Sequence, residues 1–284
     1  MAIQFGINTW CWVSPFTTAE ADALFPKIKS MGFDLVELPV EDPSHYDAIA
    51  IRPKLEASGL GATVCGAFGP NRDLASDDSA IIEECVRYVE AVLKIAQGVG
   101  AKVVAGPMYS AVGKARQVPP DVRKRERDRA VAGLRRLAPM AADHGVKLAV
   151  EPLNRFETDM INTAAQAISL VDEVGHPNVG VHLDTFHMNI EEESAYEAIK
   201  ATGKRLYHVH ASESHRGTPG HGTAQWDHLA RGLKEIGYSG PVVIETFTPA
   251  VKEIARAAAI WRPLAPSQDY LAEEGLRFLK RLLA

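Results

Sequence analysis

Short runs of β-forming residues alternate with amphipathic stretches along the whole chain. The amphipathic stretches have apolar residues at three- and four-residue spacing and include residues 19–31, 81–97, 121–144, 163–174 and 226–236. The predicted strands are rich in Val, Ile and aromatic residues and cover residues 3–12, 35–40, 62–67, 102–108, 147–153, 179–187, 206–212 and 242–247. This alternation is typical of an α/β fold with a parallel sheet.

A single (β/α)8 TIM barrel over residues 1–284 is the fold that the alternation favours. The length of 284 residues suits such a barrel, which typically has about 250 residues. An open doubly wound sheet is the alternative, but no GxGxxG motif follows the first strand and no P-loop is present. No Pro-, Gly- or Ser-rich linker divides the chain. Residues 261–269 are typical of a loop before a last helix over residues 271–283.

Four predicted strands carry a polar residue near the end, where a barrel of this kind places its active site. These residues are Glu151, Asp184, His210 and Glu245. Period-two alternation puts them on the face opposite the apolar residues that pack against the helices. All four are therefore expected to point into the barrel and to converge at its mouth.

A divalent metal ion is the simplest reason for three carboxylates to converge in a poorly solvated site. Without a cation between them they would repel one another and their pKa values would rise. We therefore expect Glu151, Asp184, His210 and Glu245 to bind one metal ion. The oxygen majority favours a hard ion, so Mn²⁺ is expected first, with Co²⁺, Mg²⁺ or Zn²⁺ as alternatives. A structural hydrogen bond would explain any one of these residues, but not four on consecutive strands.

Other polar residues allow structural explanations. Glu37, in the second strand, points inward and is equally suited to supporting a ligand and to a structural role. His182 and His208 also point inward, but deeper, as expected for hydrogen-bond donors behind the metal ligands. Acidic and basic residues alternate over residues 123–129, which is typical of a solvated helix face.

Charge and cysteine content narrow the possible functions. A formal net charge of −5 argues against a nucleic-acid partner, which would need a basic surface. The three cysteines form no CxxC pair, so they indicate neither a disulfide framework nor a thiolate zinc site. The N-terminal residues lack the features of a signal peptide, and no run approaches the roughly 18 apolar residues of a membrane span. We therefore expect a cytoplasmic protein without a membrane partner.

Four segments resemble the ketose 3-epimerases, a group that includes D-tagatose, D-psicose (allulose) and L-ribulose 3-epimerases on a xylose-isomerase-like barrel. The segments are EPLNRFE (151–157), HLDTFHMNIEE (182–192), HVHASESHRGTPGHG (208–222) and VVIETF (242–247). The resemblance implies an isomerase that epimerises free ketoses at C3 by proton transfer through a cis-enediolate. It also implies a small-molecule ketose as the substrate and a homodimer or homotetramer as the assembly.

The resemblance also implies roles for individual residues. The four proposed ligands match the metal ligands of the family, and two of them, Glu151 and Glu245, also match its catalytic acid/base pair. A further set matches residues that contact the substrate: Glu157, His187 and Arg216 at its O1–O3 end, and Cys65, Gly66 and Tyr109 along the rest of the pocket.

Other functions stay open at this point. An aldose–ketose isomerase of the hydroxypyruvate- or xylose-isomerase type, or an inosose dehydratase, would share the barrel and the metal. A metal-dependent endonuclease would need further His and carboxylate ligands and a basic groove, and neither is evident. A non-catalytic sugar- or metal-binding barrel would not need both Glu151 and Glu245. Trp261 is compatible with a subunit interface and equally with packing in the core.

Overall fold

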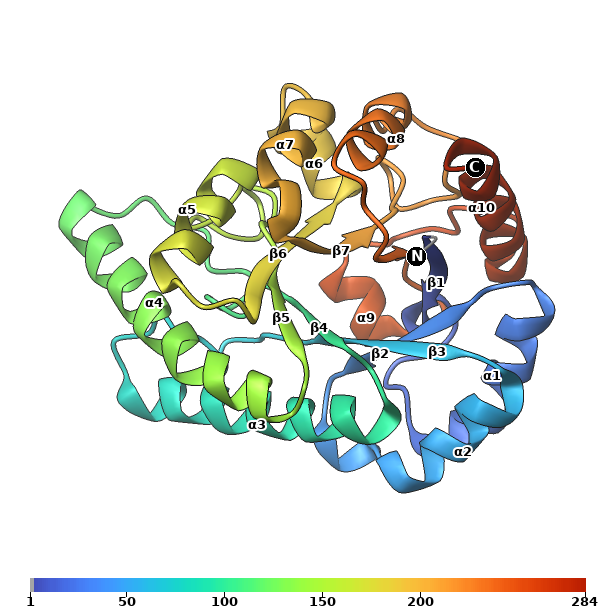
Figure 1. Ribbon diagram of the computed structural model, residues 1–284, viewed down its shortest axis with the longest axis horizontal. Coiled ribbons are helices and arrows are strands. Elements are labelled where there is room, and N and C mark those ends of the chain that lie inside the picture. Colours follow the sequence, from blue (N-terminus) through green and yellow to red (C-terminus); the bar gives the residue numbers. More distant parts are fainter. Residues whose placement is uncertain (1–2) are drawn as a thin grey trace.

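The strands close into one parallel barrel, as the sequence pattern predicts (Figure 1). The computed structural model describes residues 3–284, so residues 1–2 of the predicted domain lie outside the described part. Each strand pairs with the next, and β8 pairs with β1. The strands are β1 (Gln4–Asn8), β2 (Leu35–Val40), β3 (Gly61–Gly66), β4 (Val103–Gly106), β5 (Lys147–Val150), β6 (Val179–Asp184), β7 (Leu206–His210) and β8 (Pro241–Ile244).

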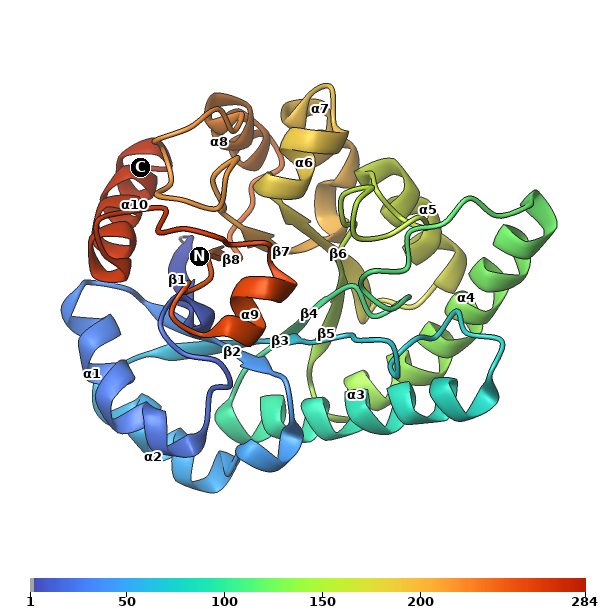
Figure 2. The ribbon, with the colours of Figure 1, turned by 180° about the vertical axis from the view of Figure 1, so that it is seen from behind.

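Helices surround the barrel and connect successive strands (Figures 1 and 2). Two of them, α6 and α7, follow β6, and two more, α9 and α10, follow β8. The helices are α1 (Ala21–Ser30), α2 (Ala48–Ser58), α3 (Ser79–Val99), α4 (Pro120–Asp143), α5 (Ala164–Val174), α6 (Thr185–Glu191), α7 (Ala195–Thr202), α8 (Trp226–Glu235), α9 (Lys252–Ala257) and α10 (Gln268–Leu282). Short 3-10 helices occupy Thr9–Cys11, Thr18–Glu20, Pro43–His45 and Gly203–Arg205.

Side-chain caps mark the first residues of α3 and α5, and glycines end both helices before the next strand. The Asp78 carboxylate accepts a hydrogen bond from the first turn of α3, and Gly100 ends this helix in the left-handed region. At α5, Thr163 and Gln166 form a reciprocal capping box, and Gly175 ends the helix in the same way as Gly100. Because these glycines turn the chain back toward the barrel, the next strand begins a few residues later.

Several strands end earlier than predicted, because the chain leaves the hydrogen-bonded ladder at the mouth of the barrel. β1, β5, β6 and β8 stop at residues 8, 150, 184 and 244 instead of 12, 153, 187 and 247. Asp184 begins α6, since its carboxylate accepts a hydrogen bond from the Phe186 backbone N–H at 2.8 Å. Glu151 and Glu245 therefore stand one residue beyond their strands, and His187 lies on a helix.

Part of the charged run at residues 123–129 is buried, so the prediction of a solvated face was wrong for it. Glu126 on α4 is only 3% exposed, because the turn of the helix directs it against the loop after β4. Its carboxylate accepts hydrogen bonds from Arg116 at 2.8 Å and from Arg123 at 2.9 Å. We call the connected ion pairs the α4 ion cluster; its members are Asp73, Lys114, Arg116, Arg123, Glu126 and Asp159.

The outer surface resolves one alternative left by the sequence. Trp261, in the loop between α9 and α10, is 75% exposed, so packing in the core does not account for it. A role in the predicted homodimer or homotetramer stays a prediction. None of the helices within residues 3–284 is both long and apolar enough to cross a membrane.

Candidate active site

A cavity of about 500 Å³ opens at the C-terminal end of the barrel, where enzymes of this architecture place their active sites. Helix α9 lies across this end of the barrel (Figure 2). Ile254 and Ala257 of α9 form part of the cavity wall, and Trp10 and Phe247 line it below the helix. The remaining wall includes the charged residues that follow β5, β7 and β8.

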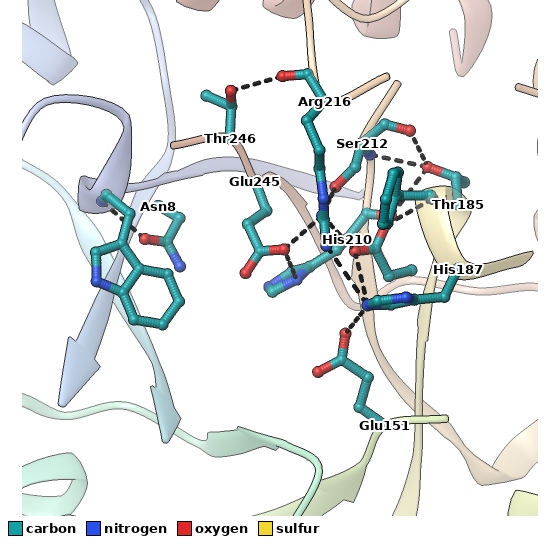
Figure 3. Close-up of polar contacts among 12 residues, drawn as sticks. Asn8, Glu151, Thr185, His187, His210, Ser212, Arg216, Glu245 and Thr246 are labelled. Carbon is teal, nitrogen blue, oxygen red and sulfur yellow. Dashed lines mark hydrogen bonds and ion pairs between the residues drawn. The ribbon is translucent and has the colours of Figure 1, made fainter. Parts of the chain in front are cut away.

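The structure brings the four predicted metal ligands together. Glu151, Asp184 and His210 offer ligand atoms that lie within 4.8 Å of one another, and all three residues are buried. Asp184 and His210 are register partners on the adjacent strands β6 and β7. Glu245 joins them, because its Oε2 lies 3.5 Å from His210 Nδ1. Figure 3 shows Glu151 and Glu245 reaching the same space from different sides.

The donor atoms of this group fit a divalent cation. His210 Nε2 lies 2.6 Å from Glu37 Oε2, whereas His210 Nδ1 is buried and has no hydrogen-bond partner among the described residues. Nδ1 is therefore the ring nitrogen available to a metal ion, on the side where Glu245 lies. Three carboxylates and one imidazole nitrogen are a ligand set that suits Mn²⁺ and similar ions.

The guanidinium group of Arg216 lies between two of these carboxylates. Its Nη1 donates to Asp184 Oδ2 at 2.7 Å. The same atom donates to Glu245 Oε2 at 2.6 Å (Figure 3). The group also stacks near Phe186 and Phe247, at 4.0 and 5.2 Å from the ring centroids. Arg216 is 6% exposed, so it is a buried cation that offsets part of the negative charge of the site.

Burial and local charge separate the pKa values of the carboxylates. Burial raises the pKa of Glu151 well above its ordinary value, and the nearby charges of Glu245 and Asp184 add to the rise. Burial also raises the pKa of Asp184, although Arg216 opposes the change. At Glu245 burial acts in the same direction, but His210 and Arg216 outweigh it and lower the pKa to about 2. The predicted acid/base pair therefore consists of two groups with different proton affinities.

The predicted substrate-binding residues are brought together with one exception. Tyr109 lies outside the cavity wall: it is fully buried, and its hydroxyl donates to the backbone carbonyl of Ile161 at 3.0 Å. Tyr109 therefore offers no free hydroxyl group to the cavity. The residues that do line the cavity are Cys65, Gly66, Glu157, His187 and Arg216.

Asn154 links two of the predicted substrate-binding residues. Its side-chain amide donates to Glu157 Oε1 at 2.8 Å, and its backbone N–H donates to His187 Nδ1 at 3.1 Å. Burial lowers the pKa of His187, and the charge of Arg216 lowers it further, so the ring is neutral at pH 7. Because Nδ1 accepts a hydrogen bond, Nε2 carries the proton and is turned toward Glu151 Oε1, 3.7 Å away.

A buried polar network lies beneath these residues. Both oxygens of Glu37 are engaged: Oε1 accepts from Thr63 Oγ1 at 2.9 Å and lies 2.7 Å from His208 Nε2, while Oε2 faces His210. His182 lies beside Glu151, with 3.5 Å between Nδ1 and Oε2. The rings of His182, His208 and His210 also bring nitrogen atoms that could ligate a metal within 4.8 Å of one another. Glu37 thus holds the ring of His210, a predicted metal ligand, through the Nε2 atom that faces away from Glu245.

Sequence reasoning gave no role to several residues that shape the site. Asn154, Glu213 and Phe247 are buried, and each follows the mouth end of a strand within four residues. That position is the signal that could have identified them, because side chains there reach the active-site end of the barrel. Trp10, which follows β1 in the same way, also lines the cavity.

The chain is similar to known proteins along almost its whole length. Residues 25–282 match the family described as xylose isomerase-like TIM barrel. The chain is 34% identical to a probable ketose 3-epimerase of Synechocystis sp., covering 98% of this chain and 96% of that protein. It is 32% identical to a ketose 3-epimerase of Arthrobacter globiformis, again covering 98% and 96%. The crystal structure of a D-allulose 3-epimerase from Methylomonas sp. with D-allulose has a TM-score of 0.93 at 31% identity, covering 99% of this chain and 97% of that one. The chain therefore belongs to the xylose isomerase-like TIM barrel family and, within it, to the ketose 3-epimerases.

Proposed function

We propose that the protein catalyses metal-dependent epimerisation of free ketoses at C3, with substrates of the D-tagatose, D-fructose/D-psicose or L-ribulose type. One observation carries the proposal: Glu151 and Glu245, which follow β5 and β8, reach one cavity at the mouth of the barrel. Inverting a carbon by proton transfer requires a base on one face and an acid on the other. The family of the chain supports a ketose as the molecule that lies between them.

The two carboxylates would act in sequence on the same carbon. One takes the proton from C3, and the electron pair forms a C2–C3 double bond while the C2 carbonyl oxygen gains the negative charge of a cis-enediolate. The other group, which starts the cycle protonated as a carboxylic acid, then delivers its proton to the opposite face of C3, and the C2 carbonyl forms again. The direction of the reaction determines whether Glu151 or Glu245 is the base.

A divalent ion would be held by Glu151, Asp184, His210 and Glu245, and we propose Mn²⁺, with Co²⁺ or Mg²⁺ as alternatives. When bound, it supplies Lewis-acid stabilisation of negative charge on the sugar oxygens. The ligand set supports this proposal because three of its members already lie within 4.8 Å of one another.

Three side chains would hold the O1–O3 end of the substrate. Arg216 presents guanidinium N–H donors, and His187, whose Nδ1 accepts from the Asn154 N–H, presents a neutral Nε2–H donor. Glu157 accepts from Asn154 through Oε1 and can accept a sugar hydroxyl through its other oxygen. Cys65 and Gly66 would line the rest of the pocket. Tyr109 is left out, because its hydroxyl is bonded to a backbone carbonyl.

The charges of the cavity support an unphosphorylated substrate. Among the described residues that line it, Arg216 is the one Lys or Arg side chain, and Asp184 and Glu245 already engage its Nη1 atom. Glu41 and Glu253 add negative charge to the wall. Tight phosphate binding relies on charged or multiple donors, which this wall lacks.

Isotope exchange tests the proposed reaction. The protein would be loaded with Mn²⁺ and incubated in D₂O with D-fructose, D-tagatose or L-ribulose, and the products analysed by NMR. We expect deuterium at C3 of the epimerised ketose, because the proton returned to C3 comes from a carboxyl group that exchanges with solvent.

The same experiment separates the alternatives. An aldose product with deuterium at C1 or C2 would indicate an aldose–ketose isomerase. In a parallel incubation with an inosose as the substrate, loss of water would indicate a dehydratase. Unchanged sugars in the presence of each candidate metal would contradict catalysis and favour a binding protein. Protein treated with a chelator serves as the control and is expected to be inactive.

A further inference from the structure

The loop between β7 and α8 is organised around one buried carboxylate, that of Glu213, which is 0% exposed. Four N–H donors from the loop and from the start of α8 converge on this side chain. Oε1 accepts from the backbone N–H groups of Ser214 at 2.7 Å and Ala224 at 3.0 Å, and Oε2 accepts from the Gly220 N–H at 2.8 Å and Trp226 Nε1 at 3.0 Å. The carboxylate therefore joins both ends of the loop to its middle.

The loop packs closely around this carboxylate. A Cβ atom at Gly222 would lie 2.5 Å from Glu213 Oε1, so only glycine allows this approach. Burial raises the pKa of Glu213, but the donors around it outweigh burial and lower the pKa below its ordinary value. The group is thus ionised at neutral pH, and hydrogen bonds to an ionised acceptor are stronger than those to a neutral one.

Arg216 lies within this loop in an unfavourable backbone conformation. Its φ of 62° is in the left-handed region, which a non-glycine residue keeps only where its surroundings hold it. Its N–H donates to the Glu213 carbonyl at 2.8 Å, and its own carbonyl accepts from Thr246 Oγ1 at 2.7 Å. From this conformation the guanidinium group donates hydrogen bonds to the carboxylates of Asp184 and Glu245.

We propose that Glu213 is a positioning residue for the reaction: its carboxylate holds the loop that keeps Arg216 in the left-handed conformation and its guanidinium in the site. Glu213 does not line the cavity, so its effect on substrate passes through Arg216. The kinetic part of this inference rests on the proposed epimerase function. The structural part, that Glu213 holds the loop closed around Arg216, can be tested without activity.

A double-mutant cycle tests the kinetic part. Glu213→Gln keeps the size of the side chain but places an amide NH₂ against N–H donors. We expect kcat/KM to fall on the order of 100-fold, because small displacements of a substrate-orienting group cost this much. In an Arg216→Ala background, the same change is expected to cost no more than about twofold. Equal losses in both backgrounds would overturn the proposal, as would a Glu213→Gln enzyme with wild-type kcat/KM.

Trypsin cleavage at the Arg216–Gly217 bond tests the structural part. In the wild type, burial of Arg216 protects the bond, and in Glu213→Gln we expect cleavage at least about tenfold faster, because a released loop opens locally. Mass spectrometry would identify fragments 1–216 and 217–284. Equal cleavage rates at this bond in the wild type and in Glu213→Gln would overturn the proposal, even if no ketose were epimerised. Faster cleavage in the variant together with an inactive wild type would contradict only the proposed function.

Two further variants serve as a control and as a milder change. Asp34→Asn alters a carboxylate at the opposite end of the barrel, where Oδ2 accepts from the Phe5 N–H at 2.9 Å, and it is expected to leave the 216–217 bond protected. Trp226→Phe removes one donor to Glu213 and keeps an aromatic ring, so an intermediate cleavage rate is expected. If Glu213→Gln does not fold, Trp226→Phe provides the test. An Arg216–Gly217 bond that stays as protected in Trp226→Phe as in the wild type would then overturn the proposal.

Discussion

Glu151 and Glu245 stand one residue beyond the last ladder positions of β5 and β8, so replacing them changes the site and leaves the strands intact. We predict that Glu151→Gln and Glu245→Gln each lower kcat by about 10²–10⁴-fold, the contribution of a single acid or base. Steady-state kinetics would measure the loss, and circular dichroism would show a folded barrel. Asp34→Asn, at the opposite end, is the control with near-wild-type kcat. Near-normal turnover in either glutamine variant would rule out the two-carboxylate mechanism.

Glu37 and His210 form the contact that directs Nδ1 of the imidazole toward the site. We predict that Glu37→Gln lowers metal affinity by about 10–100-fold, because the partner of a ligating histidine sets its tautomer and orientation. Isothermal titration with Mn²⁺ measures this directly.

The matched control for Glu37→Gln is Thr63→Val, which removes a hydrogen bond to Glu37 Oε1 and leaves the contact with His210 on Oε2 intact. Its metal affinity is expected to stay within about threefold of the wild type. An equal loss in both variants would show that the network acts on the fold as a whole and not through His210.

Two loops at the mouth of the barrel are joined to each other and to a helix. The Gly113 N–H donates to the Glu157 carbonyl at 2.7 Å, and the Asp159 N–H donates to the Lys114 carbonyl at 3.0 Å. The α4 ion cluster then ties the first loop to α4 through Glu126, which pairs with Arg116, and the second loop through Arg123, which pairs with Asp159. Since Glu157 lines the cavity, the cluster supports one wall of the site although its own members lie outside that wall.

Breaking this cluster is predicted to affect both stability and substrate binding. Asp159→Asn leaves Arg116 and Arg123 with weaker partners, so we expect a loss of about 1–3 kcal/mol in the free energy of unfolding and a higher KM. Urea unfolding and steady-state kinetics would measure the two effects. Asp128→Asn is the control, because it breaks an ion pair in which the side chains of Asp128 and Lys124 are 50% and 74% exposed. It is expected to change the free energy of unfolding by no more than about 0.5 kcal/mol. Equal effects of the two variants would contradict the role of the cluster.

Acid pH provides a second test of the contribution of Asp159 to the α4 ion cluster. Burial raises the pKa of Asp159, but Arg123 and Arg116 outweigh it and lower the pKa below the ordinary value of 3.8. The ionised side chain therefore stabilises the folded state above pH 3.8, and this contribution is lost as the pH falls through the lower folded-state pKa. We expect the stability difference between wild type and Asp159→Asn to narrow below pH 3.8. A difference that widens on acidification would contradict the assignment.

For the whole molecule, a bound ion is expected to add to the stability of the barrel. An ion that binds the folded state alone stabilises it by about 2.7 kcal/mol at a free concentration 100 times its Kd. We therefore predict a higher melting temperature with Mn²⁺ than with a chelator, and a smaller rise in Glu151→Gln. A melting temperature unaffected by Mn²⁺, Co²⁺ or Mg²⁺ would contradict the metal site.

Much of this molecule follows from local sequence patterns. Period two along β6 and β7 placed Asp184 and His210 on the inner face, and the alternation of β-forming runs with amphipathic stretches predicted the closed barrel. Tyr109 shows the limit of such reasoning, because its position depends on a carbonyl 52 residues away, at Ile161. The role of Glu213 was also hidden, since three of its four donors are backbone N–H groups, which exist at every residue type except proline.

Helix α9 has a consequence for changing the substrate range in the laboratory. The segment between Phe247 and Gln268 contributes Ile254, Ala257 and Ala258 to the cavity wall, whereas the proposed proton-transfer groups sit at strand ends. Part of the shape of the cavity is therefore encoded in a stretch of the gene that does not encode the proposed proton-transfer groups. A library that varies the α9 segment alone samples cavities for sugars of different size while every clone keeps the same reactive centre.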